Sequence, residues 1–387
     1  MSGSSRRSGA FGWKALLGIA ISVALLAFAL RGVDLHEVLR EIGRAKPLWF
    51  LAAVFAATAV FLVRAWRWKP LLQPMLPDSP LYPRFAATTI GFMANNILPV
   101  RIGEFARAFA LSRLQPIPVA ASFGTVAVER LFDGLTIVVF LIISIALPTF
   151  PGTATVDGIE IGGLLRVFMA PFAAAGVVLL AMVVWPRQAV GIFERTVARL
   201  LPRGLRRPVV DALEAFVAGL AVLRTPSLIL RVSFWSIGLW LLNALSFWLA
   251  FRAFDIPVGF GGALFLQSLI AIMVAAPSAP GFFGPYEAAV RIGLVGLWGV
   301  EANKALGFAI GFHIGSFIPV TVIGLYFAWR LGFSLREVER TEEVVEQAIE
   351  RDAPGVGRSH GDETASTANG AGGRQDPLRN AGGAARP

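Results

Sequence analysis

The chain contains no cysteine and only three histidines among its 387 residues. Without cysteine there is no disulfide, no thiolate nucleophile and no cysteine ligand for a metal. With three histidines and no H-E-x-x-H sequence, a metalloprotease or another histidine-ligated metal enzyme is disfavoured. The sequence G-x-x-x-x-G-K-[ST] is missing as well, which excludes nucleotide hydrolysis by a P-loop. We therefore expect neither a metal nor a cofactor.

Charged residues are also few, at 16% of the chain, whereas 56% of the residues are hydrophobic. A soluble core does not require so many. Crossing a hydrocarbon layer of about 30 Å takes roughly 20 apolar residues, and stretches of this length recur along the chain. Two further apolar regions, 85–114 and 260–299, are interrupted by proline, glycine and charge. We predict an all-α polytopic membrane protein with spans near residues 15–31, 47–64, 118–148, 163–185, 228–252 and 303–330.

The distribution of Lys and Arg predicts the orientation, because short loops rich in these residues stay in the cytoplasm. Residues 187–224 contain seven arginines, whereas 151–161 contain two acidic residues and no Lys or Arg. The basic N-terminus belongs on the same side as the arginines. Residues 11–31 lack a signal-peptide cleavage pattern, so the first span is expected to be retained. We expect an inner-membrane protein with both termini in the cytoplasm.

The chain divides into three parts: a cytoplasmic N-terminal segment (1–13), a transmembrane domain (14–330), and a cytoplasmic charged helix followed by a disordered polar tail (331–387). Its net charge of +10 is scattered over membrane-flanking loops, which fits a membrane surface better than nucleic acid. Residues 188–223 mix arginine with apolar residues, as an interfacial amphipathic helix would. A solvated connector is the alternative. Residues 33–46 are expected to form a short surface helix on the outer side.

Eight ionisable residues, four basic and four acidic, lie within otherwise apolar sequence. A charge at the bilayer centre costs about 2.5–3.5 kcal/mol, so such residues usually pair, face a cavity and serve transport or catalysis. We predict the functional site among them. They are Arg101, Glu104, Arg107, Glu129, Arg130, Asp133, Glu287 and Arg291.

These charges also have purely structural interpretations. Glu129 and Asp133 could neutralise Arg101 or Arg107 across helices, and Glu287 could pair with Arg291. The same holds for other polar residues in the apolar segments. Asn95, Asn96, Asn243 and Gln267 are expected to hydrogen-bond between helices. His313 is expected to be a satisfied packing residue. The sequence Arg64-x-x-Arg67-Trp68 is expected mainly to anchor a helix at the membrane interface, and only secondarily to contact a headgroup.

The two interrupted regions resemble each other. Each has a proline followed four residues later by a glycine, then a glutamate and an arginine: Pro99, Gly103, Glu104 and Arg107 in the first, and Pro280, Gly284, Glu287 and Arg291 in the second. Proline removes a backbone donor and glycine adopts unusual dihedrals, so both regions should be broken helices or re-entrant hairpins. Entering from opposite faces, they would form an inverted repeat around a site near the midplane. Helix N-termini after the two prolines would favour an anionic ligand.

Three motifs carry a resemblance to a known family: N-x-x-P-x-R-x-G-E-x-x-R at 96–107, E-R-x-x-D at 129–133, and P-x-x-P-G-x-x-G-x-Y-E at 277–287. Across residues 14–330 the chain resembles the lysylphosphatidylglycerol synthase transmembrane-region family of flippase-like integral membrane proteins. The resemblance implies a domain that moves an aminoacylated lipid between leaflets; in two-part members a soluble acyltransferase-like domain makes that lipid. After Leu331 too few ordered residues remain for a synthase domain, so we expect the flippase-like part alone.

We therefore predict a transmembrane helix bundle that moves a phospholipid or a polyprenyl-phosphate-linked lipid between leaflets. Arginines would engage the phosphate bidentately, while carboxylates hold the arginines or engage a cationic headgroup. The alternatives are a membrane-embedded lipid-modifying transferase with carboxylates as general bases, and a non-catalytic accessory subunit of lipid or glycan assembly. Expected partners are a membrane lipid and a separate lipid-modifying or glycosyltransferase enzyme. The predicted substrate-binding residues are Asn96, Arg101, Glu104, Arg107, Glu129, Arg130, Asp133, Pro280, Gly284, Glu287 and Arg291.

Overall fold

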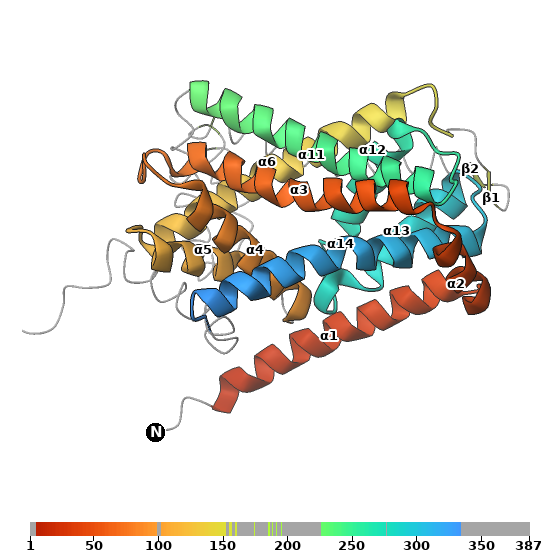
Figure 1. Ribbon diagram of the computed structural model, residues 1–387, viewed down its shortest axis with the longest axis horizontal. Coiled ribbons are helices and arrows are strands. Elements are labelled where there is room, and N and C mark those ends of the chain that lie inside the picture. Colours follow the sequence, from red (N-terminus) through yellow and green to blue (C-terminus); the bar gives the residue numbers. More distant parts are fainter. Residues whose placement is uncertain are drawn as a thin grey trace, which may run out of the picture.

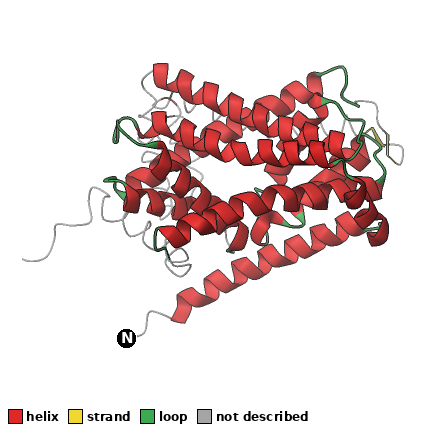
Figure 2. Cartoon of the chain, viewed as in Figure 1, coloured by secondary structure: helices red, strands yellow, loops and turns green. Residues whose placement is uncertain are grey.

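The computed structural model describes residues 5–98, 102–151, 155–156, 159–160, 226–275 and 277–333, and five single positions between 174 and 195. Almost everything described is helical (Figure 2). The ten α-helices of these ranges are α1 (Ser5–Leu30), α2 (Leu35–Arg44), α3 (Pro47–Leu72), α4 (Leu81–Ile97), α5 (Gly103–Leu114), α6 (Val119–Ala146), α11 (Pro226–Ala253), α12 (Phe260–Met273), α13 (Pro285–Val290) and α14 (Ala302–Arg330). The predicted all-helical class is confirmed, apart from a two-stranded antiparallel hairpin of β1 (Thr155–Val156) and β2 (Ile159–Glu160).

Three of the described helices, α3, α11 and α14, are long and apolar enough to cross a membrane. The end of α1 and α2, bent by 81° against each other, add a fourth if they form one span. Helix α6 has 28 residues, but every 18-residue stretch of it includes three charged side chains. The predicted spans at 47–64, 118–148, 228–252 and 303–330 thus correspond to α3, α6, α11 and α14. The predicted span 163–185 and the predicted interfacial helix 188–223 lie outside the continuously described ranges.

The long helices α3, α6, α11 and α14 run beside one another along the long axis of the molecule (Figure 1). Helices α3 and α11 form the most extensive helix pair of the described part and run in opposite directions. Helices α4 and α5 pack together toward one end of the bundle, whereas α12 enters from the end at which β1 and β2 lie (Figure 1). One interrupted region, α4 and α5, thus lies toward one end of the bundle, and α12, which begins the other interrupted region, lies toward the opposite end.

In both interrupted regions the helices stop and restart. In the first, α4 ends at Ile97 and α5 begins at Gly103. The two helices approach so closely that a Cβ on Gly91 would lie 2.6 Å from the carbonyl oxygen of Gly103. In the second, α12 is followed by a 3-10 turn, η3 (Pro280–Phe282), then by α13 and the π-helical η4 (Arg291–Leu297). Gly284 precedes α13 with φ of 99°, a conformation that glycine adopts without a steric penalty.

The predicted short helix at 33–46 is present as α2. Asp34 caps its N-terminus by accepting a hydrogen bond from the backbone N–H of His36 at 2.8 Å. Val38 is buried, whereas Leu35 and Leu39 are exposed. An amphipathic helix with exposed leucines fits a position against lipid.

Pro70 lies inside α3, where it has no N–H to donate to the carbonyl of Trp66. Arg84 at the start of α4 supplies the donor: its Nη1 hydrogen-bonds to the carbonyl of Ala65 and lies 3.5 Å from that of Trp66. Its Nε also donates to the carbonyl of Pro80 at 3.0 Å. The C-terminal turns of α3 are thereby held by a side chain of the next helix.

Candidate functional site

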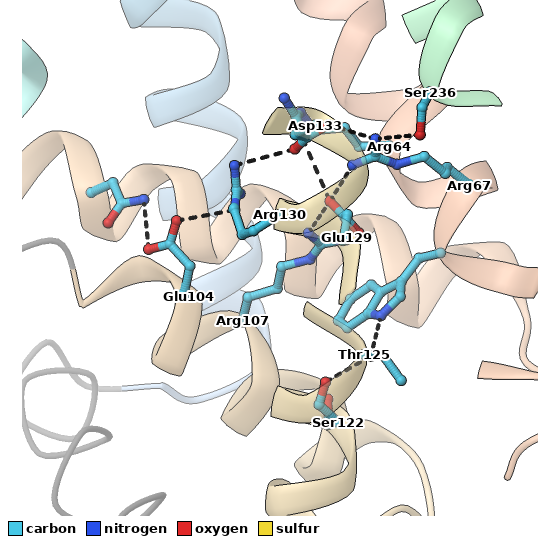
Figure 3. Close-up of polar contacts among 12 residues, drawn as sticks. Arg64, Arg67, Glu104, Arg107, Ser122, Thr125, Glu129, Arg130, Asp133 and Ser236 are labelled. Atoms are coloured by element: carbon cyan, nitrogen blue, oxygen red, sulfur yellow. Dashed lines mark hydrogen bonds and ion pairs between the residues drawn. The ribbon is translucent and has the colours of Figure 1, made fainter. Parts of the chain in front are cut away.

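Charged side chains from α3, α5 and α6 converge inside the bundle (Figure 3). We call this group the arginine–carboxylate cluster. It consists of Arg64, Arg67, Glu104, Arg107, Glu129, Arg130 and Asp133. Residues three or four apart share one face of a helix, which explains how Arg64 and Arg67 of α3 face Glu129 and Asp133 of α6.

Glu129 is the centre of the cluster and is completely buried. Its Oε1 accepts a hydrogen bond from Arg107 Nη1 at 2.7 Å and lies 2.8 Å from Arg67 Nη2. Arg64 Nη1 lies 3.5 Å from the same oxygen. In the described part of the chain, Oε2 has no hydrogen-bond donor. One carboxylate oxygen of Glu129 therefore contacts arginines from both α3 and α5.

Asp133 lies one helical turn further along α6 and joins the same arginines to α11. It accepts hydrogen bonds from Arg67 Nη1 at 2.5 Å and from Arg64 Nη1 at 3.0 Å. The indole N–H of Trp240 on α11 donates to it at 2.9 Å. Arg67 also donates to the hydroxyl of Ser236 at 3.0 Å. These contacts tie α3, α6 and α11 together through polar groups.

Arg107 is held from a second direction by an aromatic ring. Its guanidinium carbon lies 3.9 Å from the centroid of the Trp68 ring, within the range of a cation–π interaction. Trp68 is in turn fixed by a hydrogen bond from its indole N–H to the hydroxyl of Thr125 at 2.8 Å. The guanidinium therefore has a defined orientation before any ligand arrives.

One edge of the cluster reaches the surface. Arg130 Nε lies 3.4 Å from Glu104 Oε1, and these side chains are 38% and 27% exposed. Asn95 of α4 donates from Nδ2 to Glu104 at 3.3 Å and accepts at Oδ1 from the N–H of Gly103 at 2.8 Å. In sequence, Arg101 falls in the connection between α4 and α5, but it lies outside the described residues.

The cluster carries four arginines against three carboxylates, a net charge of +1. Buried charges are stable only when paired, and removing one partner of a buried pair costs about 3–5 kcal/mol. An excess of guanidinium suits an anion and not a metal cation. Guanidinium groups bind phosphate or carboxylate with two parallel hydrogen bonds. Chemically, the arrangement can accept a phosphate-bearing group at its arginines.

A second buried acid lies in the other broken region, separate from this cluster. Glu287 Oε2 accepts from the N–H of Gly284 at 2.6 Å, and its Oε1 lies 2.7 Å from His313 Nδ1 on α14. The ring of Tyr286 stacks on the imidazole with centroids 4.0 Å apart. His313 is thus hydrogen-bonded inside the protein, and its partner is Glu287.

One structural alternative for this region was wrong. Glu287 is engaged by Gly284 and His313, whereas Arg291 donates to the carbonyl of Ala29 on α1 at 2.8 Å, so the alternative of a Glu287–Arg291 pair fails. The α-helix expected after Pro280 begins at Pro285, because a 3-10 turn intervenes. The backbone N–H of Gly284, the N-cap residue of α13, already donates to the Glu287 carboxylate.

The structure thus brings together five of the predicted site residues, Glu104, Arg107, Glu129, Arg130 and Asp133. Asn96 hydrogen-bonds to Thr321 of α14 at 2.7 Å, and Asn243 to Gln267 at 2.9 Å, which confirms the expected contacts between helices. The remaining predicted residues lie elsewhere: Pro280, Gly284, Glu287 and Arg291 in the second broken region.

Sequence reasoning missed two members of the cluster. Arg64 and Arg67 were interpreted as an anchor at the membrane interface, but they are 6% and 0% exposed and face Glu129 and Asp133. The available signal was their three-residue spacing on a helix that stays regular beyond Arg64. The expected neutralisation of Arg107 by Glu129 is confirmed.

Long apolar helices enclosing a paired charged cluster define an integral membrane protein. The chain belongs to the family described as the lysylphosphatidylglycerol synthase TM region, whose model matches residues 15–324. The resemblance drawn from the three motifs is thereby confirmed.

Individual relatives are more distant. The chain is similar to a UPF0104 membrane protein of Methanothermobacter thermautotrophicus, with 23% identity over 325 residues that cover 81% of this chain and 91% of that protein. It is also similar to Glycosyltransferase AglD of Haloferax volcanii, with 26% identity over 334 residues, 79% of this chain and 52% of that protein. No solved structure matches the chain.

Proposed function

We propose that the protein moves a phosphate-bearing lipid, either a phospholipid or a polyprenyl-phosphate-linked lipid, between the leaflets of the cytoplasmic membrane. The observation that carries this proposal is the arginine–carboxylate cluster, which places a net positive charge within the bundle of an integral membrane protein. Such charges are expensive in a membrane and usually serve a substrate pathway.

The donors of the cluster support an anionic substrate. Within the described part of the chain, Arg107 Nε and Nη2 and Arg64 Nε are buried and have no hydrogen-bond acceptor. A lipid phosphate with its several oxygens would accept from such donors. The exposed edge at Arg130 and Glu104 is the place where a headgroup would enter.

The two broken regions support movement. In this proposal they are oppositely entering hairpins of an inverted repeat, with the first opening to the cytoplasm, where both chain termini lie. Broken helices of this kind form the gates of transporters that alternate access to a site near the midplane. The proposed substrate-contacting residues are the cluster arginines together with Arg101.

Leaflet exchange in proteoliposomes tests the proposal. With a labelled phospholipid and no soluble donor, the protein should accelerate exchange while the lipid stays covalently unchanged. Arg107→Lys keeps the charge beside Glu129 but loses the guanidinium fork. Exchange should then fall about tenfold, the size of one lost charge-assisted hydrogen bond. Arg330→Lys, the same change at the exposed end of α14, should leave the rate unaltered.

A lipid-modifying transferase is the second candidate, favoured by the similarity to Glycosyltransferase AglD. Against it, the carboxylates of Glu129 and Asp133 are each held by arginines, and an ion-paired carboxylate is a poor general base. If mass spectrometry finds a new group on the lipid once a donor is supplied, while exchange stays at the rate of empty vesicles, the transferase is correct. If the protein is instead an accessory subunit of a separate glycosyltransferase, leaflet exchange should appear only when that enzyme is added to the assay.

A further inference from the structure

A pocket of about 450 Å³ lies between the C-terminal part of α3 and the N-terminal part of α11, outside the arginine–carboxylate cluster. It is lined by Trp66, Lys69, Pro70, Gln73, Arg231 and Trp235. The α3 residues recur every three or four positions, and the two α11 residues are four apart, so each helix contributes one face. Arg67, between Trp66 and Lys69, points away into the cluster. The volume falls in the range of small-molecule sites, about 300–1,000 Å³.

The charge of this pocket is of one sign. Among the described residues, Lys69 and Arg231 are the charged ones that line it, and no acidic side chain of this part of the chain does. In the described ranges, neither of the two has an ion pair or a side-chain hydrogen bond. Two neighbouring cations without a carboxylate fit a phosphate.

Aromatic and apolar side chains place the pocket at the edge of the hydrocarbon layer. Trp66 and Trp235 both line it, with ring centroids 5.9 Å apart, and tryptophan is enriched at the membrane–water interface. Next to the pocket, exposed apolar side chains follow the outer face of α11 along the length of the bundle: Leu230, Phe234, Ile237, Leu241 and Leu245. A lipid with its headgroup in the pocket would find an apolar surface for an acyl chain.

A smaller pocket of about 310 Å³ at the opposite end of the same helix pair provides an internal comparison. There Lys46 is paired with Asp255, and this hydrogen bond lowers the pKa of the Asp255 carboxyl, which stays charged. Trp49 of that pocket and Trp66 are 17 positions apart on α3, or about 26 Å along a helix. This is close to the hydrocarbon thickness of about 30 Å. The two pockets thus lie at the two interfaces, and the described lining of the pocket at Lys69 contains no carboxylate.

We propose that the Lys69–Arg231 pocket binds the phosphate of an anionic phospholipid from the leaflet at that end of the bundle, with an acyl chain along α11. In the orientation inferred from the basic loops, this is the cytoplasmic leaflet. The site requires only that the chain lies in a membrane. It does not depend on lipid transport, and its test measures binding alone.

Native mass spectrometry of the full chain in detergent, titrated with phosphatidylglycerol or with phosphatidylcholine of the same acyl chains, tests the site. The protein should retain at least one phosphatidylglycerol under conditions that remove phosphatidylcholine. In the variant K69Q/R231Q the affinity for that lipid should fall roughly tenfold or more. R40Q/R44Q, which removes two charges from α2, is the matched control and should bind as the original protein does.

Two further arms distinguish a lipid site from a binding site for a soluble ion and from a folding defect. Glycerol 1-phosphate should not compete at concentrations comparable to the lipid, and K69R/R231K, which keeps both charges, should retain the bound lipid. The proposal is overturned if K69Q/R231Q keeps its lipid, if R40Q/R44Q loses as much, or if the soluble phosphate competes equally well.

Discussion

Arg107 and Glu129 lie 2.7 Å apart with side chains that are 2% and 0% exposed, whereas Arg130 and Glu104 of the same cluster lie 3.4 Å apart and are partly exposed. The two pairs therefore differ in solvent access more than in chemistry. Their contributions to stability should differ accordingly.

We expect Arg107→Gln to destabilise the protein by about 3 kcal/mol, the lower end of the cost of breaking a buried pair, because Arg67 remains beside Glu129. Arg130→Gln should cost less, about 1 kcal/mol, because its contacts with Glu104 and Asp133 are both 3.4 Å long and Arg130 itself is 38% exposed. The free energy of unfolding in mixed micelles of mild detergent and dodecyl sulfate measures both. Equal losses for the two variants would mean that burial does not set the strength of these pairs.

The second broken region allows charge to be separated from hydrogen bonding. In Glu287→Gln the amide oxygen can still accept from Gly284, and the amide nitrogen can donate to His313 Nδ1. We expect Glu287→Gln to keep most of the stability, whereas Glu287→Leu leaves a buried N–H unpaired and should lose about 1–3 kcal/mol. Leaflet exchange is measured on both. A stable Glu287→Gln protein with reduced exchange would show that the charge itself is needed; full exchange would limit Glu287 to a structural role.

Close helix packing predicts a different response at two glycines. A Cβ at Gly103 would collide with the carbonyl oxygen of Gly91 and with Asn95, whereas one at Gly134 meets nothing within 4 Å. Gly103→Ala should therefore destabilise the protein by about 1–3 kcal/mol. Gly134→Ala should be neutral or stabilising by up to about 1 kcal/mol, because alanine favours a helix. Thermal unfolding in detergent distinguishes the variants, and a tolerated Gly103→Ala would contradict the observed α4–α5 contact.

The orientation can be tested with single cysteines in this cysteine-free chain. His36 in α2 and Asp78 in the connection from α3 to α4 are exposed at opposite ends of the bundle. In intact cells, a membrane-impermeant maleimide should label His36→Cys, while Asp78→Cys should be labelled only after the membrane is opened. The reverse result would invert the topology, and labelling of both in intact cells would exclude α3 as a span.

Most of the long helices could be predicted from the sequence, because the length of an apolar stretch is a local property of the chain. The predicted spans 118–148 and 303–330 end within two residues of α6 and α14. The end of α3 was predicted too early, since hydropathy treats Arg64 and Arg67 as residues leaving the membrane. Their burial depends on carboxylates 62 to 69 positions away on α6, which no local pattern contains.

The candidate site was likewise predictable only where a local sequence pattern marked its residues. Charges within apolar sequence marked Glu104, Arg107 and Glu129, and the structure brings these residues into one cluster. The pairing of Glu287 with His313 was not predictable, because it depends on how α13 packs against α14. The contacts of Arg101, outside the described residues, stay a prediction.

The contact of Arg84 with α3 links the shape of one helix to the position of another. The carbonyl freed by Pro70 has its substitute donor on α4, so undocking of α4 would leave this carbonyl without that donor. If α4 moved away, α3 would be free to bend one turn from Arg67. Arg84 therefore couples α4 to α3. A displacement of α4 would remove this contact and allow α3 to bend close to Arg64 and Arg67, the arginines that hold Glu129 and Asp133.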